Sequence, residues 1–215
     1  MLNKKKQSVL FLSPHPDDLE LSAALLCIKL RRKFQLIEVV LTNGAMGGIA
    51  KEIIGTKKLI KIRKNESLAS ARILKIKKVI FLDYPDKNLK NKINHATCIL
   101  ENIVKEHNVK MLCFPSSYDQ HSDHLATNFI AKNILNKRKD IIDLQYCFWG
   151  NNKLNNIKIS LLRSSGTKKS AIYQHKSQKI DEYLSNNKDI LKKELFYSKR
   201  IFYIKNKIKN LCLIR

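Results

Sequence analysis

The chain alternates short apolar runs, each the length of a buried strand, with longer stretches in which apolar residues recur at helical spacing. The strand-like runs lie at 8–13, 34–43, 77–85 and 109–115, and the helical stretches lie at 18–33, 59–74, 95–108 and 124–137. Strands that alternate with helices pair in parallel, because each helix returns the chain to the same end of the sheet. The pattern therefore predicts an α/β fold with a mostly parallel central sheet and helices on both faces.

The pattern is less regular in the last third of the chain. Two strand-like runs, at 144–150 and 157–163, flank the polar turn NNKLNN, and we expect helical segments from Thr167 onward. The length suits one well-buried domain and is short for two, and no repeat or low-complexity linker divides the chain. We therefore expect a single domain over residues 1–215.

Composition narrows the class of protein. The apolar fraction of 44% is that of a folded protein, and 42 Lys and Arg against 18 Asp and Glu give a net charge of +24. Such a surface favours anionic partners. The five cysteines are scattered and odd in number, as expected of reduced thiols in a cytoplasmic protein. No run reaches the length of about 20 apolar residues that a membrane span needs. We expect a soluble cytoplasmic protein.

Two polar clusters follow predicted strands. HPDDLE, at 15–20, follows the first strand, and SSYDQHSDHLAT, at 116–127, follows the strand that ends at Pro115. Ligands of parallel α/β sheets bind outside the carboxyl ends of the strands, so the two clusters should converge. Either cluster alone has an ordinary interpretation, in which one aspartate caps the next helix. Together, their imidazoles and carboxylates form the ligand set of a catalytic zinc ion.

These residues resemble a known family. PHPDD followed by LE, and HSDH at 121–124, are similar to the HPDD and H-x-D-H motifs of the PIG-L/LmbE-like zinc-dependent de-N-acetylases. Arg63 and Glu66 match the family's R-x-x-E segment, FLDYPD at 81–86 its post-strand motif, and residues 171–178 its late A-x-x-x-H-x-S-Q pattern. The resemblance implies a Rossmann-like three-layer sandwich. This sequence departs from the family pattern at two places. The loop TNGAMGG lacks an acidic residue, and in HSDH a serine replaces the commoner proline.

The resemblance also implies which residues of the two clusters are the metal ligands and which is the general base. His15, Asp18 and His124 would bind zinc, or another divalent transition metal, and Asp17 would be the general base. His121 would donate to the developing oxyanion, and Asp123 would orient the His121 ring. The adjacent carboxylates of Asp17 and Asp18 repel each other. A dication offsets this repulsion, because one carboxylate can bind the ion while the other acts as the base.

Two more residues are expected to contact substrate. Arg63 matches a substrate-contacting position of the family, and the late motif brings His175 toward the mouth of the site. The alternatives are a solvated charge on an amphipathic helix for Arg63 and a helix-surface histidine for His175. The implied reaction is hydrolysis of the N-acetyl amide of an N-acetylglucosamine-type conjugate, which releases acetate and a free amine.

Two other functions compete with this hydrolase. A basic protein that binds nucleic acid or an anionic surface without catalysis would use the net charge of +24. It would leave both clusters unexplained, and no nucleic-acid-binding motif is present, so we expect no nucleic acid partner. A phosphoester hydrolase would need a carboxylate-rich site for two metal ions. The group attached to the sugar and the oligomeric state, including a homo-oligomer, are left open.

The end of the chain is basic and patterned. Residues 197–215 contain six Lys and Arg and no acidic residue, and Ile201, Ile204, Ile208 and Leu211 recur at helical spacing. A helix here would either pack its apolar stripe on its own domain or lie on an anionic membrane. In the second case the enzyme would be peripheral to the inner face of the membrane, and its substrate would be anionic or lipid-linked.

Overall fold

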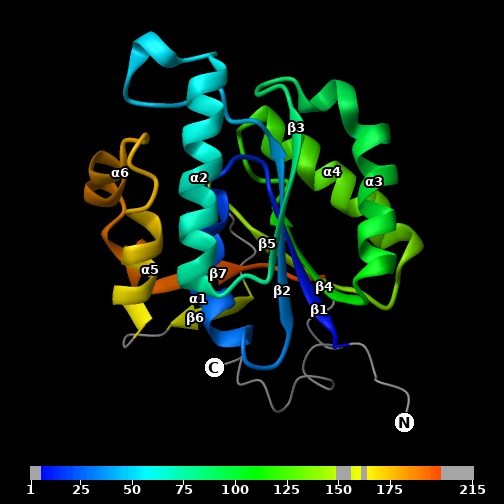
Figure 1. Cartoon of the computed structure of the whole chain (residues 1–215). Coiled ribbons are helices and arrows are strands. Elements are labelled where there is room, and N and C mark those ends of the chain that lie inside the picture. The colour runs from blue at the N-terminus through cyan, green and yellow to red at the C-terminus, as the bar shows by residue number, and fades with distance from the viewer. Residues whose placement is uncertain (1–5, 149–155, 161–163, 200–215) are drawn as a thin grey trace.

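A computed structural model describes residues 6–148, 156–160 and 164–199 and places a five-stranded sheet at the centre of the molecule (Figure 1). The strand order is β3-β2-β1-β4-β5, and each pairing in this sheet is parallel. Its strands are β1 Ser8–Ser13, β2 Gln35–Thr42, β3 Lys78–Tyr84, β4 Val109–Pro115 and β5 Ile142–Tyr146. The predicted parallel sheet is confirmed. The order reverses direction at the β1–β4 pair, which is where such sheets bind ligands.

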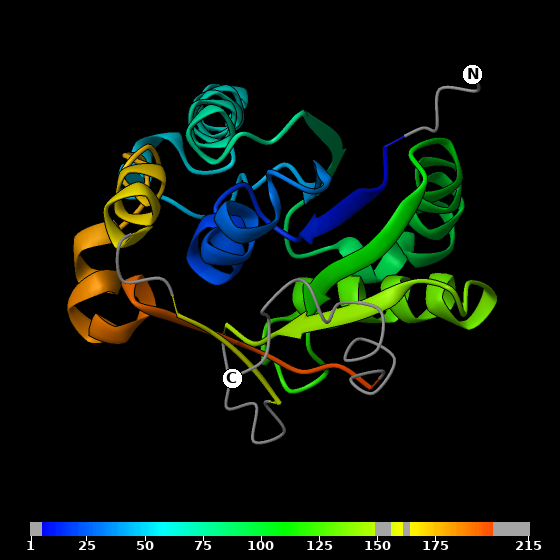
Figure 2. The ribbon, with the colours of Figure 1, turned by 90° about the horizontal axis from the view of Figure 1, so that it is seen from below.

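Helices cover both faces of the sheet (Figure 2). The helices on one face are α1 Asp18–Leu30, α2 Lys57–Leu74 and α5 Ser165–Ile172, and those on the other are α3 Ile93–Glu106 and α4 Ser122–Lys137. Successive side chains of a strand point to opposite faces. Val9 and Phe11 accordingly join the core around α1, whereas Leu10 and Leu12 join the core under α3 and α4. The predicted three-layer sandwich is confirmed.

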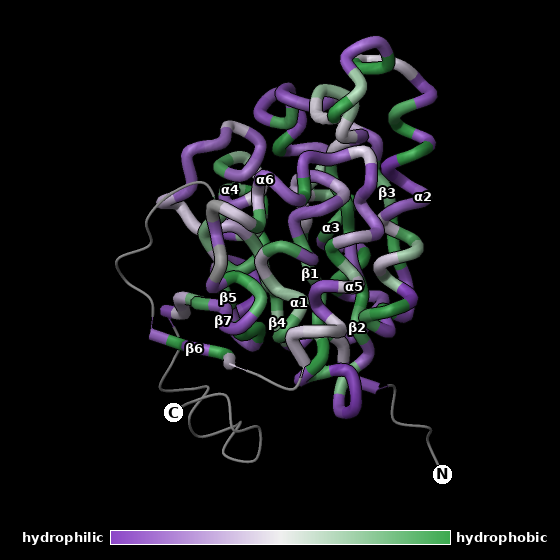
Figure 3. Tube along the Cα trace, turned by 90° about the vertical axis from the view of Figure 1, so that its left-hand side faces the viewer, coloured by the Kyte–Doolittle hydropathy of each residue, from purple (hydrophilic) through white to green (hydrophobic). Residues whose placement is uncertain are grey.

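The hydropathy pattern follows this layering. Hydrophobic and hydrophilic positions alternate along the outer helices in Figure 3, so each helix turns one side to a core and the other to solvent. Thr56 caps α2, because its Oγ1 accepts a hydrogen bond from the Leu59 backbone N–H at 3.3 Å. The helix therefore begins at Lys57, before its first buried leucine.

The later chain forms a smaller unit beside α1. β6 Ile157–Ser160 pairs antiparallel with β7 Lys193–Phe196, and α6 Ile180–Asn186 lies between them in sequence. The two strand-like runs around NNKLNN thus enter different sheets, because β5 completes the central sheet and β6 pairs with β7. Short 3-10 helices within the described ranges are η1 Lys51–Ile53, η2 Leu89–Lys92 and η4 Lys188–Leu191.

Candidate active site

The two polar clusters meet at the carboxyl ends of β1 and β4. The ring centroid of His15 lies 4.8 Å from that of His121 and 5.4 Å from that of His124. One nitrogen from each of the three rings falls within a group whose members lie within 4.8 Å of one another, close enough to share a metal ion. The convergence expected from the strand order therefore occurs, because adjacent parallel strands deliver their following loops to one place.

Asp18 lies between two of these histidines. Its Oδ2 is 3.1 Å from His15 Nδ1, and its Oδ1 is 3.3 Å from His124 Nε2. His124 is fully buried, and its Nε2 has no hydrogen-bond partner among the described residues, since its contact with Asp18 lacks hydrogen-bond geometry. A buried ring nitrogen beside a carboxylate oxygen, without hydrogen-bond geometry between them, is an arrangement that a cation would satisfy.

The opposite ring nitrogens are held by other carboxylates. His124 Nδ1 lies 3.0 Å from Asp119 Oδ2, and His15 Nε2 lies 3.3 Å from Asp86 Oδ1 and 3.4 Å from Asp123 Oδ2. When one ring nitrogen donates its N–H to a carboxylate, the other nitrogen keeps its lone pair and can bind a metal ion, as in many metal sites. This assignment turns His15 Nδ1 and His124 Nε2 toward Asp18. The donor set therefore fits a divalent transition metal.

Charge in the site supports the same fit. Burial disfavours the charged ring of His124, but Asp18 and Asp119 outweigh burial and raise its pKa to about 9. Burial likewise disfavours a charged His15, but Asp123 and Asp18 hold its pKa well above the ordinary value. The ion-free site thus attracts protons strongly. A metal ion would replace them, so its binding would release protons.

Asp17 is held by Arg63 at the base of the adjoining pocket. Arg63 Nη2 donates to Asp17 Oδ1 at 2.8 Å, and Arg63 Nη1 donates to the Gly44 carbonyl at 2.7 Å. Gly44 has φ +63°, and a Cβ there would lie 2.7 Å from Pro16 Cδ and 2.8 Å from Arg63 Nη1. The glycine of the TNGAMGG loop is therefore needed for this close approach. Arg63 lines the pocket as a buried side chain that orients Asp17.

His121 and Asp123 are connected differently from the expectation. The Asp123 carboxylate accepts backbone N–H bonds from Lys87 at 2.7 Å and Leu89 at 3.1 Å, and it faces His15. It is the Asp123 backbone N–H that donates to His121 Nδ1, at 3.3 Å. The predicted orientation of His121 by the Asp123 carboxylate is corrected, because that carboxylate is occupied elsewhere. Since Nδ1 accepts, the proton of neutral His121 is on Nε2.

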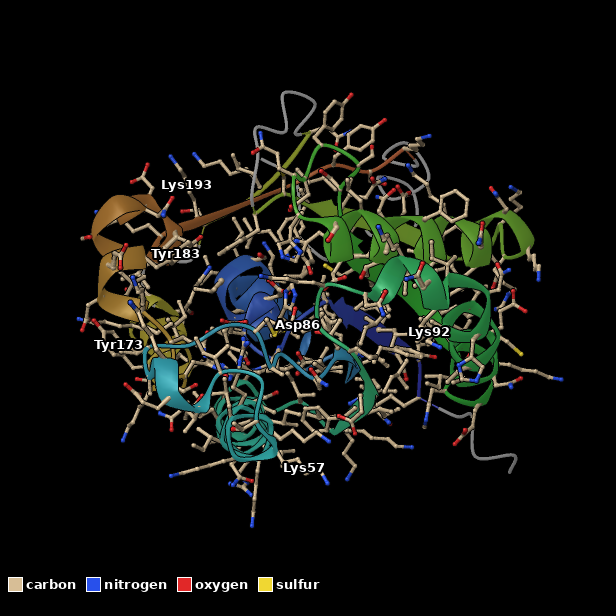
Figure 4. All side chains as sticks on the ribbon, turned by 90° about the horizontal axis from the view of Figure 1, so that it is seen from above. Lys57, Asp86, Lys92, Tyr173, Tyr183 and Lys193 are labelled. Carbon is tan, nitrogen blue, oxygen red and sulfur yellow. The ribbon has the colours of Figure 1, made fainter. Side chains whose placement is uncertain are left out.

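Asp86 is a site residue to which sequence reasoning gave no role. Its Oδ2 accepts from the Met46 backbone N–H at 2.9 Å, and its Oδ1 faces His15. Burial raises the pKa of Asp86, but His15 outweighs that effect and lowers it to about 2. Figure 4 shows Asp86 near the middle of this end of the molecule. Its position in FLDYPD, at the end of a third strand, was the signal that could have identified it.

His175 does not line the pocket. It is fully buried behind the pocket wall, and its Nε2 lies 3.3 Å from Glu20 Oε2. The expected contact of His175 with substrate is therefore wrong, because the ring is buried against α1. Two residues further along, Ser177 donates from its backbone N–H and its Oγ to the Glu66 carboxylate, at 2.7 and 2.6 Å. The late motif thereby fixes Gln178, which does line the pocket.

The pocket beside the cluster has a volume of about 280 Å³, near the lower end for small-ligand sites. Asp17, Asp18 and His121 form its polar floor. Phe148 and Tyr183 are stacked on one wall, with ring centroids 4.8 Å apart and an interplanar angle of 17°. The other apolar lining residues are Leu21, Met46 and Ile180. The pocket thus combines one hydrophobic wall with a charged floor.

A parallel α/β sheet whose strand ends hold histidines and carboxylates around one metal position, with a further carboxylate beside it, is the arrangement of metal-dependent hydrolases. The chain belongs to the PIG-L family. The family model, described as GlcNAc-PI de-N-acetylase, matches residues 10–135, more than half of the chain. Among curated proteins, none matches this sequence.

Solved structures share the fold. N,N'-diacetylchitobiose deacetylase from Pyrococcus horikoshii has a TM-score of 0.76 and 23% identity, covering 91% of this chain and 85% of its own. The zinc-inhibited form of teicoplanin deacetylase Orf2 has a TM-score of 0.67 and 12% identity, covering 90% and 99%. GalB, the 4-carboxy-2-hydroxymuconate hydratase from Pseudomonas putida KT2440, has a TM-score of 0.67 and 17% identity, covering 90% and 96%. The fold alone therefore accommodates more than one reaction.

Proposed function

We propose that this protein is a zinc-dependent hydrolase that removes the acetyl group from an N-acetylglucosamine-type conjugate and releases acetate and a free amine. The observation that carries the proposal is the convergence of His15 Nδ1, Asp18 and His124 Nε2, while carboxylates hold the outer nitrogen of each ring. Three protein ligands beside an accessible pocket are typical of catalytic rather than structural zinc. Family membership supports an N-acetyl amide as the bond that is cleaved.

The roles of the nearby side chains follow from their contacts. His15, Asp18 and His124 would hold a divalent ion, which would supply a bound water of lowered pKa and a Lewis acid for the amide carbonyl. Arg63 holds Asp17 Oδ1, so Oδ2 is the atom that accepts the proton of the attacking water and later returns it to the amine nitrogen. His121 donates from Nε2–H to the developing oxyanion. Burial and the neighbouring His15 and His124 lower the pKa of His121, which keeps its ring neutral for this role.

The pocket favours a sugar conjugate. The stacked rings of Phe148 and Tyr183 can pack against the apolar face of a sugar ring. The charged Asp86 can accept a hydrogen bond from a sugar hydroxyl. Lys87 lines the pocket and favours a conjugate that carries an anionic group, whereas Lys179, which also lines it, is paired with Glu182 at 3.1 Å. Such a substrate combines an N-acetylated sugar with a negatively charged attachment.

Four further properties of the whole protein are proposals. A cytoplasmic location and assembly into a homo-oligomer remain predictions, as does a single domain over residues 1–215. Peripheral membrane contact through residues 197–215 also remains a prediction, and most of that segment lies outside the described residues. None of the helices in the described ranges combines the length and hydropathy needed to cross a membrane.

The test is mass spectrometry of acetyl loss from a panel of N-acetylhexosamine conjugates, performed with protein of known metal content. The panel includes neutral, phosphate-bearing and lipid-linked members. We expect acetate release that stops after chelation and returns with zinc. Hydration of an unsaturated acid without acetate release would instead assign the GalB type of reaction to this chain and refute the proposal.

A further inference from the structure

The rim of the pocket carries exposed apolar side chains. Met46 is 45% exposed and Ile49 is 55% exposed, and both belong to the connection between β2 and α2. Figure 1 shows this connection projecting past the ends of the strands. Met46, Gly47 and Gly48 also line the pocket. Two large aliphatic side chains therefore project into solvent at the pocket mouth, where they contribute little to the core.

Lysines surround these apolar side chains. Lys51, Lys57 and Lys58 are exposed on the same connection and on the start of α2, and Glu52 is the one acidic residue among positions 43–61. Figure 4 shows Lys57 at the periphery of the site end of the molecule, directed away from it. Exposed lysines at 87, 90 and 92 extend the cationic rim over the connection between β3 and α3. The pocket mouth thus lies within a positively charged border.

The lysines on α2 oppose the helix dipole. Lys57 and Lys58 occupy the first turn, which contains no acidic residue. The N-terminus of a helix carries a partial positive charge, so lysines there weaken the helix and add to the local positive potential. Residues that break a local rule without a structural gain often mark a functional surface. An anion bound at this end would neutralise both the lysines and the dipole.

We propose that this rim, formed by Met46, Ile49, Lys51, Lys57 and Lys58, docks on the surface of an anionic lipid membrane with the pocket mouth facing the headgroups. Aliphatic side chains that insert below the headgroups, with lysines that reach anionic lipids around them, are the features of interfacial membrane contacts. A nucleic acid partner would match the lysines but would leave both aliphatic side chains without an apolar partner. The proposal concerns binding and is independent of the reaction.

The test is co-sedimentation of the full chain with phosphatidylcholine vesicles that contain or lack phosphatidylglycerol. We expect binding only with phosphatidylglycerol, and weaker binding as salt rises. Lys57→Gln/Lys58→Gln should weaken binding by about fivefold for each lysine removed. Met46→Ser/Ile49→Ser should weaken it by about tenfold.

Matched controls separate position from charge. Lys75→Gln/Lys77→Gln removes the same two charges at the other end of α2, about 26 Å away along an 18-residue helix, and should retain most of the binding. Leu68→Ser/Leu195→Ser removes two other exposed apolar residues and should also retain it. Circular dichroism checks that each variant is folded.

Three outcomes would overturn the proposal. One is the absence of binding by the full chain, and another is an equal loss of binding in the rim variants and their controls. The third is self-association of the chain that Met46→Ser/Ile49→Ser abolishes while vesicle binding is unchanged, which would assign the rim to a second copy.

Discussion

Two of the buried polar clusters on helix α1 differ in how completely their atoms are satisfied. At its N-terminus, Asp18 faces His124, whose Nε2 has no hydrogen-bond partner among the described residues. In its middle, the Glu194 carboxylate accepts two backbone N–H bonds from α1, at 2.8 and 3.0 Å. Lys168 Nζ donates to the same carboxylate at 2.7 Å. The first cluster borders a pocket. In the second cluster, which we call the closed cluster, the hydrogen bonds are all made to other protein groups.

The cluster with an unsatisfied atom is the one expected to act on a ligand. Buried polar groups are almost always hydrogen-bonded, so a buried group that lacks a partner requires an explanation. The Lys168–Glu194 pair leaves no such group, since its charged atoms are hydrogen-bonded within the protein. These bonds fix β7 and α5 to α1. The cluster around Asp18 retains an unsatisfied nitrogen where a metal ion would be bound. Substitutions in the first cluster should therefore affect chemistry, and substitutions in the second should affect folding.

The largest effect is expected from His124→Gln. The variant removes a ligand and leaves Asp18 without its partner, so the protein should lose its metal ion and its hydrolysis by more than about 10⁴-fold. Elemental analysis and acetate release measure the two losses. Retention of stoichiometric zinc by the folded variant would remove His124 from the ligand set.

Asp17→Asn should separate proton transfer from metal binding. We expect full metal content with kcat lowered by about 10²- to 10⁴-fold, because an amide cannot accept the proton of water. Asp83→Asn is the control, since Asp83 is an exposed carboxylate paired with Lys64, and it should leave turnover unchanged. Loss of metal with retained activity would exchange the roles of Asp17 and Asp18.

Lys168→Met tests the closed cluster. It leaves the buried Glu194 carboxylate without its cation, so the free energy of unfolding should fall by about 3 to 5 kcal/mol. Lys168→Met/Glu194→Gln removes the uncompensated charge and should recover part of that loss. Urea unfolding measures both variants, and the folded fraction should keep its metal content. Loss of metal at unchanged stability would erase the distinction between the two clusters.

The smallest effect is expected from Asp119→Asn. This variant weakens the acceptor for His124 Nδ1 without removing a ligand, so zinc affinity should fall by about 10- to 100-fold. Asp143→Asn is matched, because Asp143 is an equally buried carboxylate that accepts from Ser198 Oγ at 3.1 Å, away from the pocket. Competition with a chromophoric chelator gives the affinities. Equal affinities in the two variants would contradict the proposed orientation of His124.

The sequence predicted the fold well where the pattern is local. β1 and β4 begin and end at the predicted residues, because continuous apolar runs bounded by polar turns define buried parallel strands. The strand order placed both polar clusters at one edge, so the ligand candidates could be named. Two other features depend on tertiary packing that no local pattern encodes. They are the pairing of β6 with β7 and the contact between Lys168 and Glu194, which lie 26 residues apart in the sequence.

The supporting contacts of the site were harder to predict. Asp86 was left without a role because its partner His15 follows a different strand and comes near it only in the folded sheet. Asp119 lies five residues before its partner His124, a spacing that does not by itself predict their contact. The Asp123 carboxylate was assigned to His121, but two backbone N–H groups and His15 compete for it. His175 was expected at the pocket mouth, but its side chain is buried against Glu20, and Gln178 of the same motif lines the pocket instead.

Anomalous diffraction from crystals grown with zinc would locate the bound metal ion. We expect one peak per chain, about 2.0 to 2.2 Å from His15 Nδ1, an Asp18 oxygen and His124 Nε2. The described residues also contain a competing group, His15 with Asp86 and Asp123, whose ligand atoms lie within 4.8 Å of one another. A peak between His15 Nε2 and those two carboxylates, with none beside Asp18, would contradict the account.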